Sequence, residues 1–199
     1  MKDQSQIYPK EFVAYEQDEF GRRCVRVHRG RVEQIGPPIT PYDVRQCETQ
    51  LGFSLPCDYQ AWLLWCNGGI PRFAPKGDCW FGYLSPEGKP RADSVDVLCG
   101  IGSEYVPDYD IVREYLSRPP EFPKDCIVIG HANWQDRQRC FALAVHGPHR
   151  GKVYDWFFVP GSRRATRTRP ASGEHRMQLG SSFQEFWDKL TGEWPGEPP

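Results

Sequence analysis

One cysteine in this sequence stands where its type could support nucleophilic catalysis. Cys57 lies at the start of a helix predicted over residues 56–66, and a helix N-terminus can lower the pKa of a thiol. His28 or His131 would then serve as the base. Nothing in the sequence places either histidine beside Cys57, and the chain has no G-x-S-x-G, P-loop, G-x-G-x-x-G or zinc-deaminase signature. We therefore predict a protein that is not an enzyme and that uses no cofactor.

The spacing of cysteine and histidine also argues against a metal site. None of the eight cysteines forms a C-x-x-C or another short ligand pair, which structural zinc sites normally need. His146 and His149 form an H-x-x-H pattern, but Gly147 and Pro148 exclude the helix that would place both rings on one face. We expect no bound metal, and reduced cysteines that pack as small apolar side chains.

The strongest charge feature is an acidic stretch. Residues 93–125 hold eight acidic and three basic side chains. Such a surface favours a basic partner such as a nuclease, and the alternative is a solvated helix face with Asp108 as its N-cap. The candidate partner-binding residues of this stretch are Glu104, Asp108, Asp110 and Glu114.

A cluster of arginines lies in residues 160–178, which we predict to be an exposed loop because glycine and proline interrupt it. Arg163, Arg164 and Arg167 would hold an acidic partner or a phosphate through bidentate contacts, or would remain solvated. No aromatic residue is interleaved with them, as a single-strand binder requires. We therefore expect no direct contact with nucleic acid, and we expect the arginines and the acidic stretch to suit one dipolar partner surface.

Two tryptophans are candidate anchors for a protein partner, because interface hot spots are rich in tryptophan. Trp65 lies about 100° off the apolar stripe of its helix. Trp80 lies on a predicted strand. For both residues, packing at the core or its rim is the alternative.

The spacing of apolar residues predicts the elements that position these groups. Helices are predicted over residues 40–51, 56–66, 108–116 and 182–190, and strands over residues 79–83, 95–101, 126–129, 140–145 and 152–159. Residues 11–16 and 22–28 predict a separate hairpin. In the third helix, Val112, Tyr115 and Leu116 are predicted to face inward. This order predicts a single α+β domain, mainly an antiparallel sheet with helices packed on one side.

We divide the chain at two points. Residues 1–36 are predicted to be an N-terminal β-ribbon extension, residues 37–192 the domain with the arginine loop, and residues 193–199 a frayed tail. The 199 residues include 39% hydrophobic residues and carry a net charge of −1, so the chain can bury a core and has no global attraction for nucleic acid or membrane. No apolar run approaches the roughly 20 residues of a membrane span, and the N-terminus lacks an apolar h-region. We expect a cytoplasmic protein without membrane contact.

Four landmarks occur in an order that matches a known family. Leu51-Gly52-x-x-Leu55-Pro56-x-Asp58-Tyr59 leads to Asn67-Gly68-Gly69, and a strand at 127–130 comes next. Gly151-Lys152-Val153-Tyr154-Asp155-Trp156 and a Ser182-Phe183-x-x-Phe186 helix follow. Over residues 40 to 190 the chain resembles the SUKH superfamily in its SMI/KNR-type branch. The residues that carry the resemblance, with structural roles, are Leu51, Gly52, Leu55, Pro56, Tyr59, Asn67, Gly68, Gly69, Gly151, Tyr154, Trp156, Ser182, Phe183 and Phe186.

This resemblance implies a non-catalytic binding domain of the bacterial immunity-protein type. Such a protein neutralises a cognate polymorphic or contact-dependent toxin, often a nuclease or deaminase, by direct stoichiometric binding. The alternative is a regulatory scaffold that binds an endogenous partner, as in the fungal relatives linked to cell-wall regulation. The first 36 residues and the arginine loop depart from the family pattern, so they are candidate carriers of partner specificity.

Overall fold

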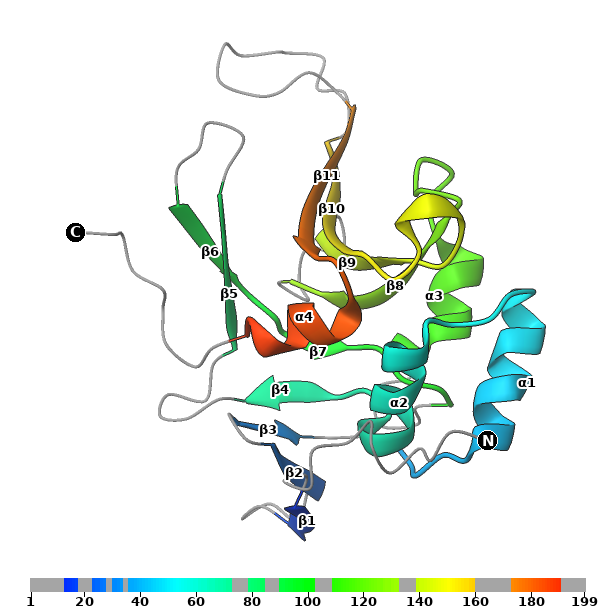
Figure 1. Cartoon of the computed structure of the whole chain (residues 1–199), viewed down its shortest axis with the longest axis vertical. Coiled ribbons are helices and arrows are strands. Elements are labelled where there is room, and N and C mark those ends of the chain that lie inside the picture. The colour runs from blue at the N-terminus through cyan, green and yellow to red at the C-terminus, as the bar shows by residue number, and fades with distance from the viewer. Residues whose placement is uncertain are drawn as a thin grey trace.

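The computed structural model describes residues 13–17, 23–27, 30–33, 36–72, 79–84, 90–102, 109–132, 139–159 and 173–190. Within these ranges, antiparallel strands and four α-helices build an α+β fold (Figure 1). The α+β class and the antiparallel sheet that the sequence predicts are confirmed. No helix in the described ranges has the length and apolar character that crossing a membrane requires.

The largest sheet has five strands in the order β11-β10-β9-β8-β7. These strands are β7 (Val97–Leu98), β8 (Cys126–His131), β9 (Arg139–Ala144), β10 (Val153–Val159) and β11 (Gly173–Gly180). Every residue of β8 is buried, as a continuous apolar run indicates. β9 and β10 form the predicted hairpin around the 3-10 helix η3 (Gly147–His149).

Strand β11 corrects the prediction of a loop over residues 160–178. From Gly173 onward the chain pairs with β10, in a register that runs from Val159 opposite Gly173 to Val153 opposite Gly180. The backbone groups on this side of β10 would otherwise lack partners, and no glycine or proline interrupts the chain between Gly173 and Gly180. The remainder of the predicted loop, residues 160–172, lies outside the described residues.

The N-terminal hairpin is confirmed and belongs to a four-stranded sheet with the order β1-β2-β3-β4. Its strands are β1 (Val13–Gln17), β2 (Arg23–Val27), β3 (Gly30–Glu33) and β4 (Ile70–Arg72). Val32 of β3 is fully buried and lies opposite Pro71. Gly69 and Leu98 exchange two backbone hydrogen bonds of 2.9 and 2.8 Å, which connect this sheet to β7. The ribbon therefore continues the hydrogen-bonded framework of the domain.

A third sheet consists of β5 (Trp80–Leu84) and β6 (Pro90–Ser94). Phe81 packs edge-on against Phe141 of β9 with 5.2 Å between ring centroids. Arg139 of β9 donates to both carboxylate oxygens of Asp155, at 2.9 and 2.6 Å, and also bonds to Asp93 of β6. Asp155 is only 1% exposed, so solvent screens the Arg139–Asp155 pair within the large sheet little. The half-buried Arg139–Asp93 pair joins the small sheet to the large one.

The predicted strand over residues 95–101 is wrong at both ends, because β6 ends at Ser94 and β7 covers only Val97–Leu98. The backbone after β7 bonds to non-strand partners. Gly100 N donates to Tyr109 O, and Ile101 N donates to the side chain of Asn67. Alternation of apolar residues could not reveal these partners.

Helices α1 (Pro41–Leu51) and α2 (Cys57–Cys66) begin and end close to their predicted bounds. The Asp43 carboxylate accepts hydrogen bonds from the hydroxyl and the backbone N–H of Thr40, and these bonds lower the pKa of Asp43. Pro56 serves as the N-cap of α2 rather than its first helical residue, because its ψ of 141° is extended. The predicted apolar stripe of α2 is buried, namely Tyr59, Trp62, Leu63 and Cys66.

Helix α4 (Phe183–Asp188) covers this stripe. Phe183 lies 4.8 Å from the Tyr59 ring and 5.2 Å from the Trp62 ring. Ser182 caps the helix by accepting from Glu185 N at 3.0 Å. The Glu185 carboxylate accepts from Ser181 N, one residue before the N-cap, at 2.8 Å. Its bonds to Lys189 and Ser181 lower the pKa of Glu185 to about 2.

Asn67 ends α2 and joins four segments of the chain. Its φ of 51° is left-handed, a conformation that asparagine tolerates better than most residues. Its side-chain NH₂ donates to Pro37 O and Ile101 O, each at 2.9 Å, and its side-chain oxygen accepts from Ile101 N at 2.7 Å. A Cβ on Gly100 would lie 2.3 Å from Asn67 O, so the segments meet too closely for a side chain there. This buried Asn67 junction connects α2, β4, β7 and the segment before α1.

Candidate partner-binding surface

A group of exposed and half-buried side chains gathers from three separate segments. Phe53, in the α1–α2 link, contacts the ring of Tyr115 with 5.4 Å between centroids and the ring of His146 with 4.7 Å. The guanidinium of Arg118 lies 3.6 Å above the Tyr115 ring. The remaining members are Leu116, which follows Tyr115 in α3 (Ile111–Ser117), and Arg150, which donates to Leu55 O at 3.0 Å. We refer to Phe53, Tyr115, Leu116, Arg118, His146 and Arg150 as the Phe53 surface.

Local backbone geometry positions Phe53 in this group. Gly52 adopts a φ of 83° and donates its N–H to Glu48 O, which ends α1 and turns the chain. The Glu48 carboxylate then accepts from Leu55 N at 2.7 Å, which fixes the link on its far side. Because Phe53 lies between these two bonds, its place beside α3 is set by the backbone.

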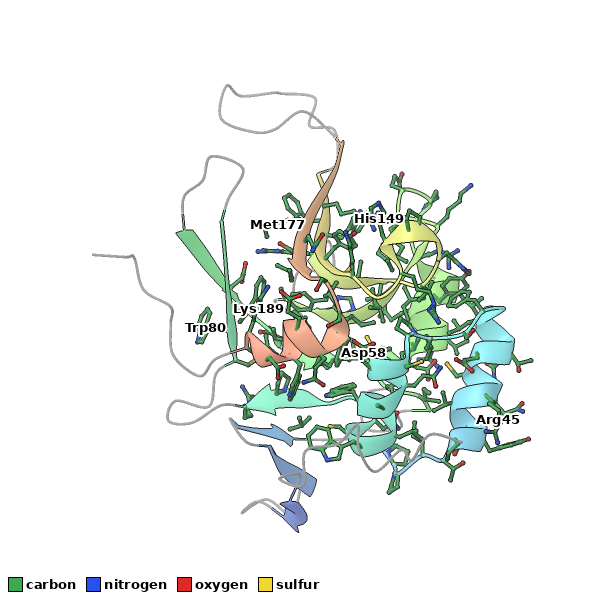
Figure 2. The ribbon with its side chains drawn as sticks, viewed as in Figure 1. Arg45, Asp58, Trp80, His149, Met177 and Lys189 are labelled. Atoms are coloured by element: carbon green, nitrogen blue, oxygen red, sulfur yellow. The ribbon has the colours of Figure 1, made fainter. Side chains whose placement is uncertain are left out.

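The other two segments have their own determinants. Asp110 caps α3 by accepting from Arg113 N at 2.9 Å, and Ile111 anchors the helix in the core with no exposed area. In the β9–β10 turn, Gly147 and Gly151 have positive φ values of 67° and 92°. These conformations favour glycine, and they place His146 and Arg150 on either side of η3. Figure 2 shows the neighbouring His149 on this turn, at the end of the molecule where α3 lies.

The two tryptophans predicted as anchors do not belong to this group. Trp65 is half-buried and packs edge-on against Trp187 of α4, with 6.5 Å between centroids. Trp80 is also half-buried, on β5, far across the molecule from His149 (Figure 2). Trp65 thus adopts the core-rim packing that was the alternative, while a partner contact of either residue stays a prediction.

The acidic residues predicted to bind a partner have internal roles where the structure describes them. Besides capping α3, Asp110 accepts from Gly102 N at 2.7 Å. Glu114 lies 3.5 Å from Nε2 of the buried His131. Three further acids of the stretch also bond within the chain, Asp93 to Arg139, Asp96 to Ser94 and Asp125 to Arg176.

Glu104 and Asp108 lie outside the described residues, and Asp110 takes the N-cap role that the sequence assigned to Asp108. The predicted arginines Arg163, Arg164 and Arg167 also lie outside the described residues. Five of the eight acids in the stretch therefore bond to groups on several different elements, and the partner contacts assigned to Asp110 and Glu114 stay predictions.

Burial determines the ionisation of most cysteine thiols in the described part of the chain. The seven cysteines from Cys47 to Cys140 are all reduced, and all of them except Cys57 are buried. Burial raises the pKa of Cys47 to about 12, and it raises the pKa values of Cys66, Cys99 and Cys140 as well. These thiols are packing groups. Among the described residues, no three His, Cys, Asp or Glu side chains gather in a way that could hold a metal ion.

Comparison with known proteins shows the family to which the chain belongs. The model of the SMI1 / KNR4 family (SUKH-1) matches residues 38–189, which is more than half of the chain. The chain belongs to the SMI1/KNR4 family. No curated protein and no solved structure matches it.

The motif residues of the SMI1/KNR4 domain lie in the core and at turns. Leu55, Tyr59, Trp156, Phe183 and Phe186 are buried. Gly52, Asn67, Gly68, Gly69 and Gly151 adopt positive φ. The motif that identifies the family thus specifies its fold, and the Phe53 surface lies beside it.

Sequence reasoning missed the Phe53 surface. It placed Leu116 inward, but Leu116 is 74% exposed. Val112 and Tyr115 are half-buried and pack against the core as predicted, while the fully buried residue of α3 is Ile111, which the prediction left out.

Proposed function

We propose that this chain is an immunity protein that neutralises a cognate toxin in the cytoplasm by direct, stoichiometric binding and without catalysis. The observation that carries this proposal is the match to the SMI1/KNR4 family over residues 38–189, a family of protein-interaction domains. The toxin would be of the nuclease or deaminase class. Binding of this chain to the toxin would block the action of the toxin without chemical change to either protein.

Two features support binding over catalysis. Burial raises the pKa values of the thiols at Cys66, Cys99 and Cys140, so these groups are poor nucleophiles at neutral pH. The Phe53 surface presents aromatic and guanidinium groups from three segments, and these residue types are enriched at protein interfaces.

The test is co-expression. The C-terminal domain of each large protein encoded beside this chain is induced in cells with and without the chain. We expect one such domain to arrest growth alone, the chain to restore growth, and the two proteins to co-purify at a fixed ratio. The purified pair then shows whether the toxin cleaves or deaminates nucleic acid, and whether the chain abolishes that activity at molar equivalence.

Two outcomes would contradict the proposal. If no neighbouring domain is toxic and the chain co-purifies only with a host regulatory protein, it is a scaffold and not an immunity protein. If rescue occurs at ratios far below equivalence and depends on Cys57, the mechanism is catalytic. Substitution of Cys57 by serine separates that case, because stoichiometric binding predicts unchanged rescue.

A further inference from the structure

The Phe53 surface combines an exposed apolar side chain with guanidinium groups that have spare donors. Leu116 is 74% exposed, the highest value among the exposed large hydrophobic residues of the described ranges. A single exposed leucine has no special meaning. This one follows Tyr115 in α3, and the Tyr115 ring contacts Phe53, which in turn contacts His146 edge-on. Side chains from three segments therefore meet at the Phe53 ring.

Two arginines carry unused hydrogen-bonding capacity here. Arg118 donates one N–H to Tyr115 O at 2.8 Å, and Arg150 donates one to Leu55 O at 3.0 Å. A guanidinium has five N–H donors. No carboxylate in the described part of the chain pairs with either arginine. The remaining donors have the fork geometry that binds carboxylates in bidentate fashion.

The local charge has the sign that an acidic ligand requires. Residues 52–56, 115–125 and 145–152 contain four basic and two acidic side chains. One of the two acids, Asp125, lies 3.6 Å from Arg176 of β11 and is engaged there. Glu48, which borders the α1–α2 link, is bonded to Leu55 N and Gln60. Of the two acids in these three ranges, Glu121 is exposed and is the one left to offset the four basic groups.

We propose that the Phe53 surface is the docking site for an acidic segment of the protein partner, in which carboxylates flank an apolar side chain. The carboxylates bind Arg118 and Arg150, and the apolar side chain packs against Leu116 and the Phe53 ring. This inference rests on the proposed binding function and names the chemistry of the partner. The whole chain carries a net charge of −1, so the attraction is local to this surface.

The geometry favours a protein segment over a nucleic acid. Single-strand binders stack bases on open aromatic faces. One face of Tyr115 is covered by Arg118 at 3.6 Å, and Phe53 is engaged by two neighbouring rings. The surface is also held in place before binding, since Arg150 N bonds to Gly147 O and Lys152 N bonds to His149 O within the turn. Such preorganisation reduces the entropy that docking costs.

The experiment uses the full chain, immobilised and panned against phage that display random dodecapeptides. We expect enrichment of peptides with Asp or Glu on either side of Leu, Ile, Phe or Met. The best sequence is then synthesised with a fluorescent label, and its affinity for the chain is measured by polarisation. The Arg118→Glu/Arg150→Glu double variant is expected to lose at least tenfold in affinity, and Leu116→Asp a similar factor.

Arg45→Glu is the matched control. Arg45 is exposed on the outer side of α1, away from the η3 turn (Figure 2), so its reversal changes net charge without changing the Phe53 surface. We expect the control to bind the peptide within twofold of the wild type. Thermal unfolding of all variants confirms that they fold, and the high exposure of Leu116 makes Leu116→Asp a safe second variant should the double charge reversal fail to fold.

Three results would overturn the proposal. These are enrichment of basic or uncharged peptides, an affinity that the Phe53-surface variants leave unchanged, and competition for the surface by a single-stranded RNA. A dimer seen by light scattering that Leu116→Asp dissociates would assign the surface to a second copy of the chain instead.

The outcome is separable from that of the proposed function. If a toxin is found and the charge-reversed variant still neutralises it, while no acidic peptide is selected, the docking site is wrong and immunity stands. If acidic peptides bind the surface but no neighbouring toxin exists, the docking site stands and immunity is wrong.

Discussion

Substitution of Asn67 by glycine tests whether the Asn67 junction holds the domain together. Glycine keeps the left-handed backbone but removes three side-chain hydrogen bonds, two to carbonyls at 2.9 Å and one from Ile101 N at 2.7 Å. The unpaired Ile101 N–H costs about 1–3 kcal/mol, and each lost bond to a carbonyl about 0.5–1.5 kcal/mol. The expected loss in free energy of unfolding is therefore about 2–6 kcal/mol, a large part of the 5–15 kcal/mol typical of a domain.

The assay is urea unfolding followed by tryptophan fluorescence and circular dichroism, with the free energy of unfolding obtained by linear extrapolation. Asn67→Ala should be less stable than Asn67→Gly by about 1 kcal/mol, because alanine cannot adopt the φ of 51° without strain. Gly52→Asn is the control, since its φ of 83° is also left-handed but a Cβ there meets nothing within 4 Å. We expect it to stay within about 0.5 kcal/mol of the wild type. A loss below about 1 kcal/mol for Asn67→Gly would refute the hydrogen-bond reasoning.

Three further predictions follow from pairing and burial. Asp155→Asn should lower the free energy of unfolding by about 1.5–3 kcal/mol in the same urea assay, because it weakens the charged hydrogen bonds that Asp155 accepts from Arg139, which keeps Asp93 as its other carboxylate partner. Glu185 has a folded pKa of about 2, below its ordinary value of 4.5, so its stabilising effect is present above pH 4.5 and is lost as the pH falls toward 2. Glu185→Gln should therefore lower the melting temperature at pH 6 and leave it unchanged at pH 2, and equal effects at both values would contradict the assigned bonds. Ellman's reagent should modify Cys57 before the six buried thiols between Cys47 and Cys140, which should react only on unfolding. In a Cys24→Ser background, Cys57→Ser should remove that first phase, and its persistence would show that another of these thiols is accessible.

The helices and the central hairpin could be predicted because their signals are local. Thr40, Asp43 and Gly52 bound α1 through cap chemistry that depends on neighbours within one turn. The buried run of β8 and the β9–β10 hairpin follow from composition and a glycine turn. These features require no knowledge of distant residues.

The errors occur where distant partners decide the structure. Strand β11 exists because β10 offers it hydrogen bonds, and the backbone after β7 bonds to the side chain of Asn67, 34 residues earlier. The Phe53 surface has the same origin, since Phe53, Tyr115 and His146 come from segments that only the tertiary fold brings together. The internal bonds of Asp93, Asp96, Asp110, Glu114 and Asp125 likewise involve partners on several elements, which charge along the sequence could not reveal.

The pairing of β3 with β4 has a consequence for the solution behaviour of this chain. Without the ribbon, β4 would end the framework with its N–H and C=O groups open to solvent, next to the Asn67 junction. Exposed strand edges are templates for intermolecular pairing and aggregation. With the ribbon present, the edge strand of the sheet is β1 and not β4. Val32 of β3 then lies opposite Pro71 of β4 and is fully buried. The N-terminal ribbon therefore protects β4 from pairing with another molecule. A variant that lacks the residues before residue 36 should precipitate at concentrations where the full chain stays in solution.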